Sequence, residues 1–263
     1  MTLSTVLYYG STVFVANDSL IRIERDDSVI GHEEGNKIAV IDGICVCSIY
    51  GQPLGWIRHA LEFKATRGTS SLAEYVRRVE TIFQDEAEAG DYFGVHIVGL
   101  NQGARSPVYH VYKRPASRVI TDPIDNGDPN KMGFLYNGMN EELNRAFPEI
   151  HRLWYRVEFD DPSIMRTVKG LYDFSGSSVG PQIGPGPIAP PYHGLIIRPT
   201  SHEYVDLTDI RGYPVTTIAR GSSNNYDYAY ALRNEVSNST AAIVDPYPAQ
   251  SSFVRDFYAQ TIP

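Results

Sequence analysis

Apolar and polar residues alternate along the start of the chain in short runs, a pattern typical of strands that bury one face. The runs predict two hairpins, Val6–Tyr9 with Thr12–Asn17 and Lys37–Ile41 with Ile44–Ile49. An Asp-Gly pair stands at the tip of the second hairpin, where it favours a tight turn. Between the hairpins, Ile21–Ile23 fits a short third strand, and the polar run RDDSVIGHEEGN predicts a loop.

Beyond the second hairpin the apolar residues recur at every third or fourth position, which predicts helices. The segments QPLGWIRHALEFKATR and TSSLAEYVRRVETIFQDEAE each place their apolar residues on one helical face. Ser70 or Ser71 can cap the second helix, with Glu74 near the reciprocal position of a capping box.

The rest of the chain mixes the two periods. Strand-like runs are YFGVHIVGL, SPVYHVYKR, GFLYNG, HGLIIRP and HEYVDL, and helical ones are NEELNRAF and Pro162–Tyr172. His96 and His110 alternate with apolar residues in the first two runs, so we expect them at the surface or the rim of a sheet. Paired hairpins without regular strand–helix–strand alternation predict an α+β domain, two antiparallel sheets with helices packed outside them.

Composition and charge narrow the classes of function. A hydrophobic fraction of 42% is enough for the core of one large domain, and the net charge of −8 disfavours a general surface for nucleic acid or anionic membranes. The chain contains no bilayer-length apolar run and does not open like a signal peptide, so we expect neither a transmembrane helix nor a secretory leader. Cys45 and Cys47 share one face of a strand, which predicts small buried residues in a reducing, cytoplasmic compartment.

The sequence shows neither metal-ligand spacing nor a phosphate-binding loop. The histidines are scattered, and the glycines at 180, 184 and 186 stand among prolines rather than between a strand and a helix. Asp160 and Asp161 precede Pro162 at a helix start, where acidic residues serve as caps more often than as acid–base pairs. We therefore assign no metal and no cofactor.

Several short motifs follow one another along the chain in a characteristic order and spacing. Asp18, in VANDS, follows Thr2 by 16 residues, and Lys37, in GNKIAVI, precedes the strand run ICVCSIYG. FGVHIVGLNQG, PVYHVY and SSVGPQI come later. In this order and spacing the motifs resemble the proteasome-like N-terminal nucleophile hydrolases, which include proteasome β subunits, bacterial HslV and the Anbu group. The resemblance covers roughly residues 2–207.

The chain departs from the family pattern at three places. Lys37 follows Thr2 by 35 residues, three more than in the family, so we expect the HEEG loop to bulge. Leu20 stands where the family often has Arg. Ser175 stands where the family has the Asp of its Asp-x-x-Ser-Gly-Gly segment, with Asp173 two residues earlier as the nearest substitute.

The resemblance implies a four-layer αββα sandwich and a threonine-type peptidase or amidase. Thr2 would be the nucleophile once Met1 is removed, with its own α-amino group as the base. Lys37 would keep that amine neutral, and Asp18 would orient Lys37. A backbone N–H of Tyr50 or Gly51 would stabilise the oxyanion.

The same resemblance implies the remaining site residues and the assembly. Ser48 and Ile49 would line the primary pocket, and Asp173, Ser175 and Ser178 would support the nucleophile. We expect residues 1–210 to form the hydrolase domain and 211–263 a Tyr-rich extension that packs on a neighbouring subunit or on its own domain. The implied partners are a peptide or protein substrate, other copies in a ring or helical stack through helices of the 52–86 region, and an unfoldase, with no nucleic acid or membrane.

Each candidate residue also has a structural explanation. Thr2 fits a disordered chain end, Asp18 a turn-forming residue after a strand, and Lys37 a solvated lysine at a strand edge. A retained Met1 would turn the amine into an amide that cannot act as a base. The alternative function is therefore a catalytically silent scaffold of the same fold, which assembles through its helices and C-terminal tail.

Overall fold

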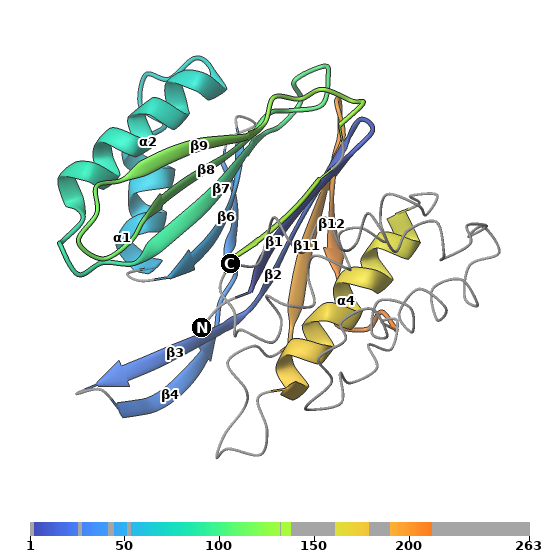
Figure 1. The fold of residues 1–263 in the computed structure, drawn as a ribbon, viewed down its shortest axis with the longest axis horizontal. Helices are drawn as coiled ribbons and strands as arrows, with labels where there is room; N and C mark the ends of the chain where they lie inside the picture. Colours follow the sequence, from blue (N-terminus) through green and yellow to red (C-terminus); the bar gives the residue numbers. More distant parts are fainter. Residues whose placement is uncertain are drawn as a thin grey trace, which may run out of the picture. The chain divides into compact units, whose positions relative to one another are not determined.

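A computed structural model describes residues 3–25, 28–41, 45–51, 54–131, 133–137, 161–178 and 190–211. The chain divides into two compact units, residues 1–138 with 190–206, and residues 139–189 with 207–263. Both large sheets and the first two helices belong to the first unit (Figure 1).

Five antiparallel strands form the first sheet, in the order β10-β1-β2-β11-β12. Their bounds are Ser4–Tyr9 (β1), Thr12–Asp18 (β2), Gly133–Asn137 (β10), Tyr192–Ile197 (β11) and His202–Asp206 (β12). The predicted first hairpin is confirmed, with Val6 opposite Val15. Gly10 takes a φ of 49° in its turn, a conformation that costs glycine little.

Five further antiparallel strands form the second sheet, in chain order from β5 to β9. Their bounds are Ile38–Ile41 (β5), Cys45–Gly51 (β6), Phe93–Gly99 (β7), Val108–Lys113 (β8) and Ile120–Asp125 (β9). Sequence reasoning did not predict β9, because Pro123 interrupts its pattern. Proline is tolerated there because β9 is an edge strand.

The predicted loop after β2 is wrong. The short strand predicted at Ile21–Ile23 is confirmed as part of β3 (Leu20–Arg25), whereas most of the segment RDDSVIGHEEGN forms a strand, β4 (Ser28–Glu34). The two strands pair with each other as a separate two-stranded sheet. The backbone N–H of Gly35 donates to the carbonyl of Ser19 at 2.9 Å and closes the neck of this hairpin. Charged residues masked the strand pattern, and a register shift between Ile23 and Glu24 breaks its alternation.

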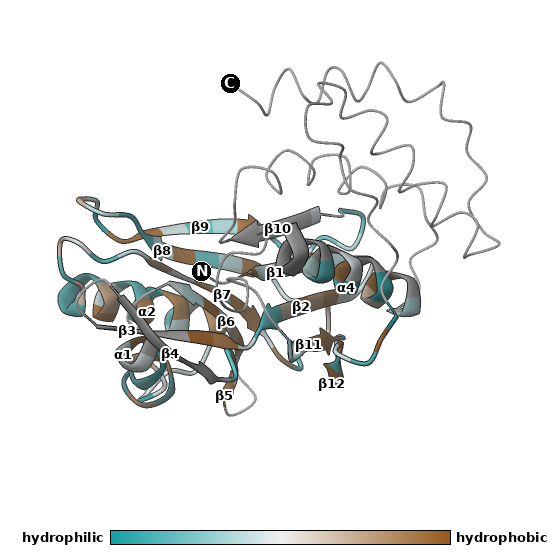
Figure 2. Cartoon of the chain, turned by 90° about the horizontal axis from the view of Figure 1, so that it is seen from below, coloured by the Kyte–Doolittle hydropathy of each residue, from teal (hydrophilic) through white to brown (hydrophobic). Residues whose placement is uncertain are grey.

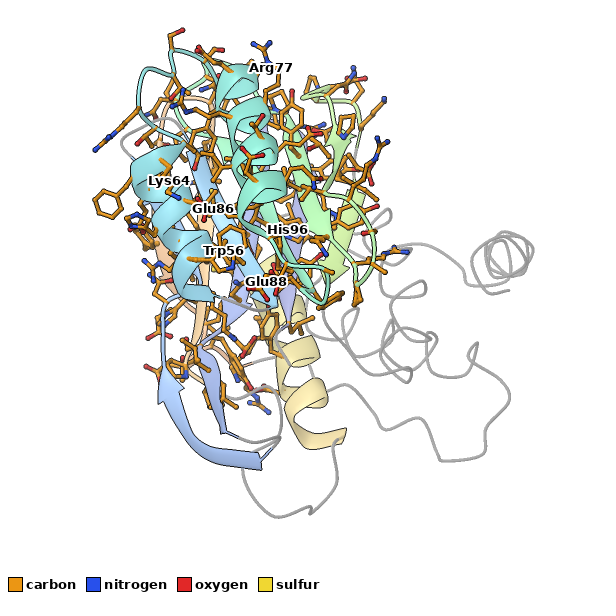
Figure 3. The ribbon with its side chains drawn as sticks, turned by 90° about the vertical axis from the view of Figure 1, so that its left-hand side faces the viewer. Trp56, Lys64, Arg77, Glu86, Glu88 and His96 are labelled. Carbon is orange, nitrogen blue, oxygen red and sulfur yellow. The ribbon has the colours of Figure 1, made fainter. Side chains whose placement is uncertain are left out.

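Helices cover the second sheet on one face (Figure 1). The first predicted helix is α1 (Leu54–His59) followed by a π-helical segment, η1 (Ala60–Lys64), and the second is α2 (Leu72–Glu86). Trp56 meets the rings of Phe83 and Phe93 edge-on at centroid distances of 5.2 and 5.3 Å, and so joins α1, α2 and β7 (Figure 3).

Two apolar layers hold the first unit together. One lies between the sheets and includes Val6, Val15, Val46, Val98 and Leu195. The other lies between the second sheet and its helices, where Cys47 is buried as predicted. Figure 2 shows hydrophobic residues along β2, β6 and β11. Alternate residues of a strand face opposite sides, so β6 contributes to both layers.

The predicted cap of α2 is confirmed. The hydroxyl of Ser71 accepts from the backbone N–H of Glu74 at 3.3 Å, and the Glu74 carboxylate accepts from the backbone N–H of Ser70 at 3.0 Å. The first contact satisfies an N–H group that the first helical turn leaves free, and the second ties the residue before the N-cap to the helix.

We expect Ser71→Ala to lower the free energy of unfolding by about 1 kcal/mol, because the N-cap acceptor is lost. Urea denaturation monitored by circular dichroism measures the change. Thr81→Ala, on an exposed position of the same helix, is the control and should change stability by less than about 0.5 kcal/mol. Equal stability of Ser71→Ala and the parent would show that the cap contributes nothing.

The described part of the second unit contains α4 (Asp161–Ser178). The helix predicted over Pro162–Tyr172 therefore extends six residues further, into a segment whose Gly and Ser residues predicted a break. Ile164, Val168 and Tyr172 are buried at helical spacing. The NEELNRAF segment, residues 179–189 and the Tyr-rich tail from 212 to 263 lie outside the described residues.

The predicted fold class is confirmed as a mixed α+β architecture with two antiparallel sheets. In the first unit, α1 and α2, the second sheet and the first sheet form successive layers. Among the described residues, no helix has the length and apolar character needed to cross a membrane.

Candidate functional site

Asp18 and Lys37 meet where β2 ends and β5 is about to begin. The Lys37 Nζ donates to Asp18 Oδ2 at 2.8 Å and to the carbonyl of Leu20 at 2.7 Å. Asp18 Oδ1 accepts from the backbone N–H of Leu3 at 2.8 Å, and Oδ2 accepts from that of Leu20 at 3.2 Å. Both side chains are buried, with 3% of Lys37 and none of Asp18 exposed. The ion pair therefore lies beside Leu3, the residue that follows Thr2.

Burial dominates the electrostatics of this pair. It raises the pKa of the Asp18 carboxyl, against the opposing effects of the Lys37 ammonium and the backbone N–H groups of Leu3 and Leu20. Burial also lowers the pKa of Lys37, against the opposing effect of the Asp18 carboxylate. Lys37 consequently gives up its proton more readily than a solvated lysine does.

The β3–β4 hairpin is attached directly to this pair. Leu20, its first residue, contacts the pair with both its N–H and its carbonyl. The backbone N–H of Ser19 donates to the carbonyl of Pro191 at 3.1 Å, which ties the hairpin neck to the start of β11. The residues that separate Lys37 from Asp18 thus form a hairpin with a closed neck, where a bulged loop was expected.

Gly51 ends β6 in a conformation that requires glycine. Its φ is 88°, and a Cβ atom there would lie 2.4 Å from the Tyr92 carbonyl oxygen and 2.6 Å from the Cα of Phe93. The neighbouring Tyr50 is buried, and its hydroxyl lies 2.7 Å from His110 Nε2.

The structure buries Ser48 and Ile49 completely. Ile49 packs in the layer between the second sheet and the helices, and Ser48 points to the other face of β6, toward the first sheet. Ser48 Oγ donates to Asn17 Oδ1 at 2.6 Å and lies 2.5 Å from Ser4 Oγ. The two residues therefore face opposite sides of one strand.

The remaining predicted residues fall in other parts of the chain. Thr2 lies outside the described residues. Asp173, Ser175 and Ser178 belong to α4 in the second unit. Asp173 pairs with Lys169 one turn earlier, with Nζ–Oδ1 and Nζ–Oδ2 distances of 2.6 and 2.7 Å. The side chains of Ser175 and Ser178 lie outside the described part.

Sequence reasoning missed a buried polar network next to the Asp18–Lys37 pair. Asn17, Ser48, Ser4 and His96 form a continuous chain of contacts between the two sheets, and His96 on β7 is labelled in Figure 3. His96 is 0% and His110 8% exposed, so the expectation of surface or rim positions is wrong. The polar residues that alternate with apolar ones in β7 and β8 face the other sheet instead of solvent. Nothing in the local pattern separates these two cases.

Other features of the described residues suggest no second chemical centre. No group of three or more His, Cys, Asp or Glu side chains among them is placed to hold a metal ion. An open groove of about 810 Å³ runs between α2 and β9. Its lining, which includes Arg77, Glu80 and Arg118, contains none of the predicted site residues.

Comparison with known proteins supports the fold. No protein-family model and no curated protein matches the sequence. Among solved structures, the chain is similar to the Anbu (Gly-1) mutant from Hyphomicrobium sp. strain MC1, with a TM-score of 0.53 and 10% sequence identity. The match covers 94% of this chain and 99% of that one. At this identity the similarity is one of fold, and it agrees with the sequence resemblance to the Anbu group.

Proposed function

We propose that the protein is a threonine-type N-terminal nucleophile hydrolase that cleaves peptide bonds through Thr2. The observation that carries this proposal is the buried Asp18–Lys37 pair, which accepts the backbone N–H of Leu3. A buried ion pair at the start of a strand is costly for a purely structural role, because desolvation offsets much of the attraction. Perturbed, buried ionisable pairs concentrate at functional sites.

The reaction requires a free α-amino group on Thr2, so Met1 and anything before it must be removed. The amine takes the proton of the Thr2 hydroxyl while Oγ1 attacks the carbonyl carbon of the scissile bond. The amide C–N bond then breaks, the amine returns the proton to the leaving nitrogen, and an ester remains on Thr2. Water attacks this ester by the same route and releases the acid, which restores the hydroxyl.

Lys37 and Asp18 tune this chemistry. The α-amine has an ordinary pKa of about 7.7–8.0, and a nearby ammonium disfavours a second positive charge on it. Lys37 would supply that ammonium, held by Asp18 and the Leu20 carbonyl. The backbone N–H at Gly51 or Tyr50 would stabilise the oxyanion of each tetrahedral intermediate.

The resemblance extends the proposal to the assembly. We infer a cytoplasmic homo-oligomer, a ring or helical stack, in which an unfoldase delivers protein substrates. Asp173, Ser175 and Ser178 would support the nucleophile. These roles rest on the family resemblance and the shared fold. Ser48 and Ile49 are fully buried and face opposite sides of β6, so we do not propose them as lining of the substrate pocket.

Intact mass spectrometry with a covalent probe tests the proposal. We expect the purified protein to lack Met1 and to gain one equivalent of a peptide β-lactone, which acylates the threonine hydroxyl as its ring opens. Peptide mapping should place the adduct on Thr2. A mass that includes Met1, or an adduct elsewhere, would contradict the proposal.

The alternative is a catalytically silent scaffold of the same fold. The observations that favour it are Ser175 at a position where the family has Asp, and Asp173 already paired with Lys169. The scaffold predicts a retained Met1 together with an intact oligomer. Analytical ultracentrifugation of the same sample measures the oligomer independently of activity.

A further inference from the structure

The side-chain amide of Asn17 links three strands that carry the candidate site. Its Nδ2 donates to the carbonyl of Ile49 at 3.2 Å and to that of Lys37 at 3.4 Å. Its Oδ1 accepts from Ser48 Oγ at 2.6 Å. Asn17 belongs to β2 of the first sheet, whereas the other residues lie on or next to β5 and β6 of the second.

The hydrogen bonds of this network can run in one direction only. Carbonyl oxygens only accept, which orients the Asn17 amide with Nδ2 toward Lys37 and Ile49 and Oδ1 toward Ser48. Ser48 donates its single hydroxyl hydrogen to Asn17 and therefore accepts from the hydroxyl of Ser4, with an Oγ–Oγ distance of 2.5 Å. Ser4 in turn accepts from the Nδ1–H of His96 at 3.1 Å. The network thus fixes both an amide orientation and a histidine tautomer.

We propose that Asn17 is a positioning residue, which holds the Lys37 backbone and the strand that ends at Gly51 in place against β1 and β2; this inference rests on the proposed function. Each element of the candidate site is tied to the network within two residues. Ser4 lies two residues after Thr2, Asn17 directly before Asp18, and Ile49 two residues before Gly51.

The burial of the network makes its geometry rigid. Ser4 and Ser48 are fully buried and Asn17 is 1% exposed, so water cannot replace a lost partner without entering the layer between the sheets. A polar group that loses its partner there moves to find another. Loss of the Asn17 amide would therefore shift Lys37 and β6 relative to the start of β1.

Reaction with the β-lactone separates positioning from folding. In Asn17→Ala and Ser48→Ala we expect the maximal rate of Thr2 acylation to fall by about 100-fold, the effect of a misplacement near 1 Å. The half-saturating lactone concentration should stay within about threefold, because the probe's remote contacts remain. Ser48→Thr, which keeps the hydroxyl, should recover most of the rate.

Ser106→Ala is the matched control. Ser106 is also buried, and its Oγ accepts from the Gly99 backbone N–H at 2.6 Å in the β7–β8 connection. We expect it to destabilise the fold to a comparable degree while the acylation rate stays at the parental value. If folded Asn17→Ala and Ser48→Ala react at the parental rate, or if Ser106→Ala loses as much, the positioning role is wrong.

A second measurement decides the inference if the parent protein itself does not react. In that case the proposed function fails, and the titration of Lys37 reads its position against Asp18. With [ε-¹³C]lysine label, assigned through Lys37→Arg, we expect the midpoint of Lys37 to differ between the parent and Asn17→Ala. An identical midpoint in the folded variants would overturn the role of Asn17.

Discussion

Lys37→Met is expected to slow acylation of Thr2 by about three orders of magnitude, within the range that general acid–base groups contribute. Without the ammonium, the α-amine of Thr2 becomes easier to protonate, and the carboxylate of Asp18 loses the cation that lies 2.8 Å away. Thr2→Ala should lose the reaction altogether. Stopped-time labelling with the lactone, followed by mass spectrometry, measures both variants.

Stability and chemistry must be separated in this experiment. Removal of Lys37 alone leaves a buried, unpaired Asp18 and should cost about 3–5 kcal/mol of unfolding free energy. Asp18→Leu combined with Lys37→Met removes both charges, so most of that loss should be recovered while the acylation remains slow. If the double variant regains both its stability and its reactivity, the pair has no part in catalysis.

Acidification from pH 7 to pH 5 should lower the free energy of unfolding by about 2 kcal/mol through His110, and His96 should add to this loss. Burial lowers the pKa of His110 to about 4, and burial together with the nearby His110 lowers that of His96 well below its ordinary value. Unfolded histidines bind protons below about pH 6.5, so the unfolded state takes up protons that the buried histidines of the folded state do not bind. The contribution of the two histidines to the free energy of unfolding is therefore fully present above about pH 6.5. It is lost as the pH falls below that value, by up to about 1.4 kcal/mol per pH unit for each histidine.

The environment of His110 defines the control. Asp122 raises its pKa slightly against burial and Arg114 lowers it, while Tyr50 contacts Nε2 and Tyr112 stacks on the ring at 4.4 Å. His110→Gln keeps a polar group but removes the titration, so the loss of unfolding free energy between pH 7 and pH 5 should be about 2 kcal/mol smaller than in the parent. Asp18 and the other acidic groups titrate alike in both proteins, so the difference isolates the histidine. Urea denaturation at both pH values measures this difference. If His110→Gln and the parent lose the same unfolding free energy between pH 7 and pH 5, His110 is not held in a buried, neutral state.

Local patterns predicted most elements because each depends on neighbours in sequence. The hairpin of β1 and β2, the two strands β5 and β6, and the capped helix α2 all follow from alternation, turn residues and an N-cap. The failures are equally specific. Two strands were not predicted, β4 because of its charged residues and β9 because of its proline. Both are edge strands, and pairing at an edge tolerates charged residues and proline.

Some residues of the candidate site were predicted from the sequence, and others were found only in the structure. Asp18 and Lys37 were selected by their order and spacing, and the structure brings their charged atoms within 2.8 Å. Asn17, Ser4 and His96 carried no comparable signal, because a polar residue in an alternating strand looks the same whether it faces solvent or another sheet. Only the partner strand across the layer distinguishes the two.

The sequence by itself determined most of the strands and helices, the α+β class, and the selection of Asp18 and Lys37 as candidate site residues. The tertiary structure alone decided that these charges are buried as a pair, that β3 and β4 fill the distance between them, and that Asn17 joins the two sheets. The reason is physical. Secondary structure is encoded in periods of a few residues, whereas desolvation and hydrogen-bond partners depend on groups that the chain brings together from far apart.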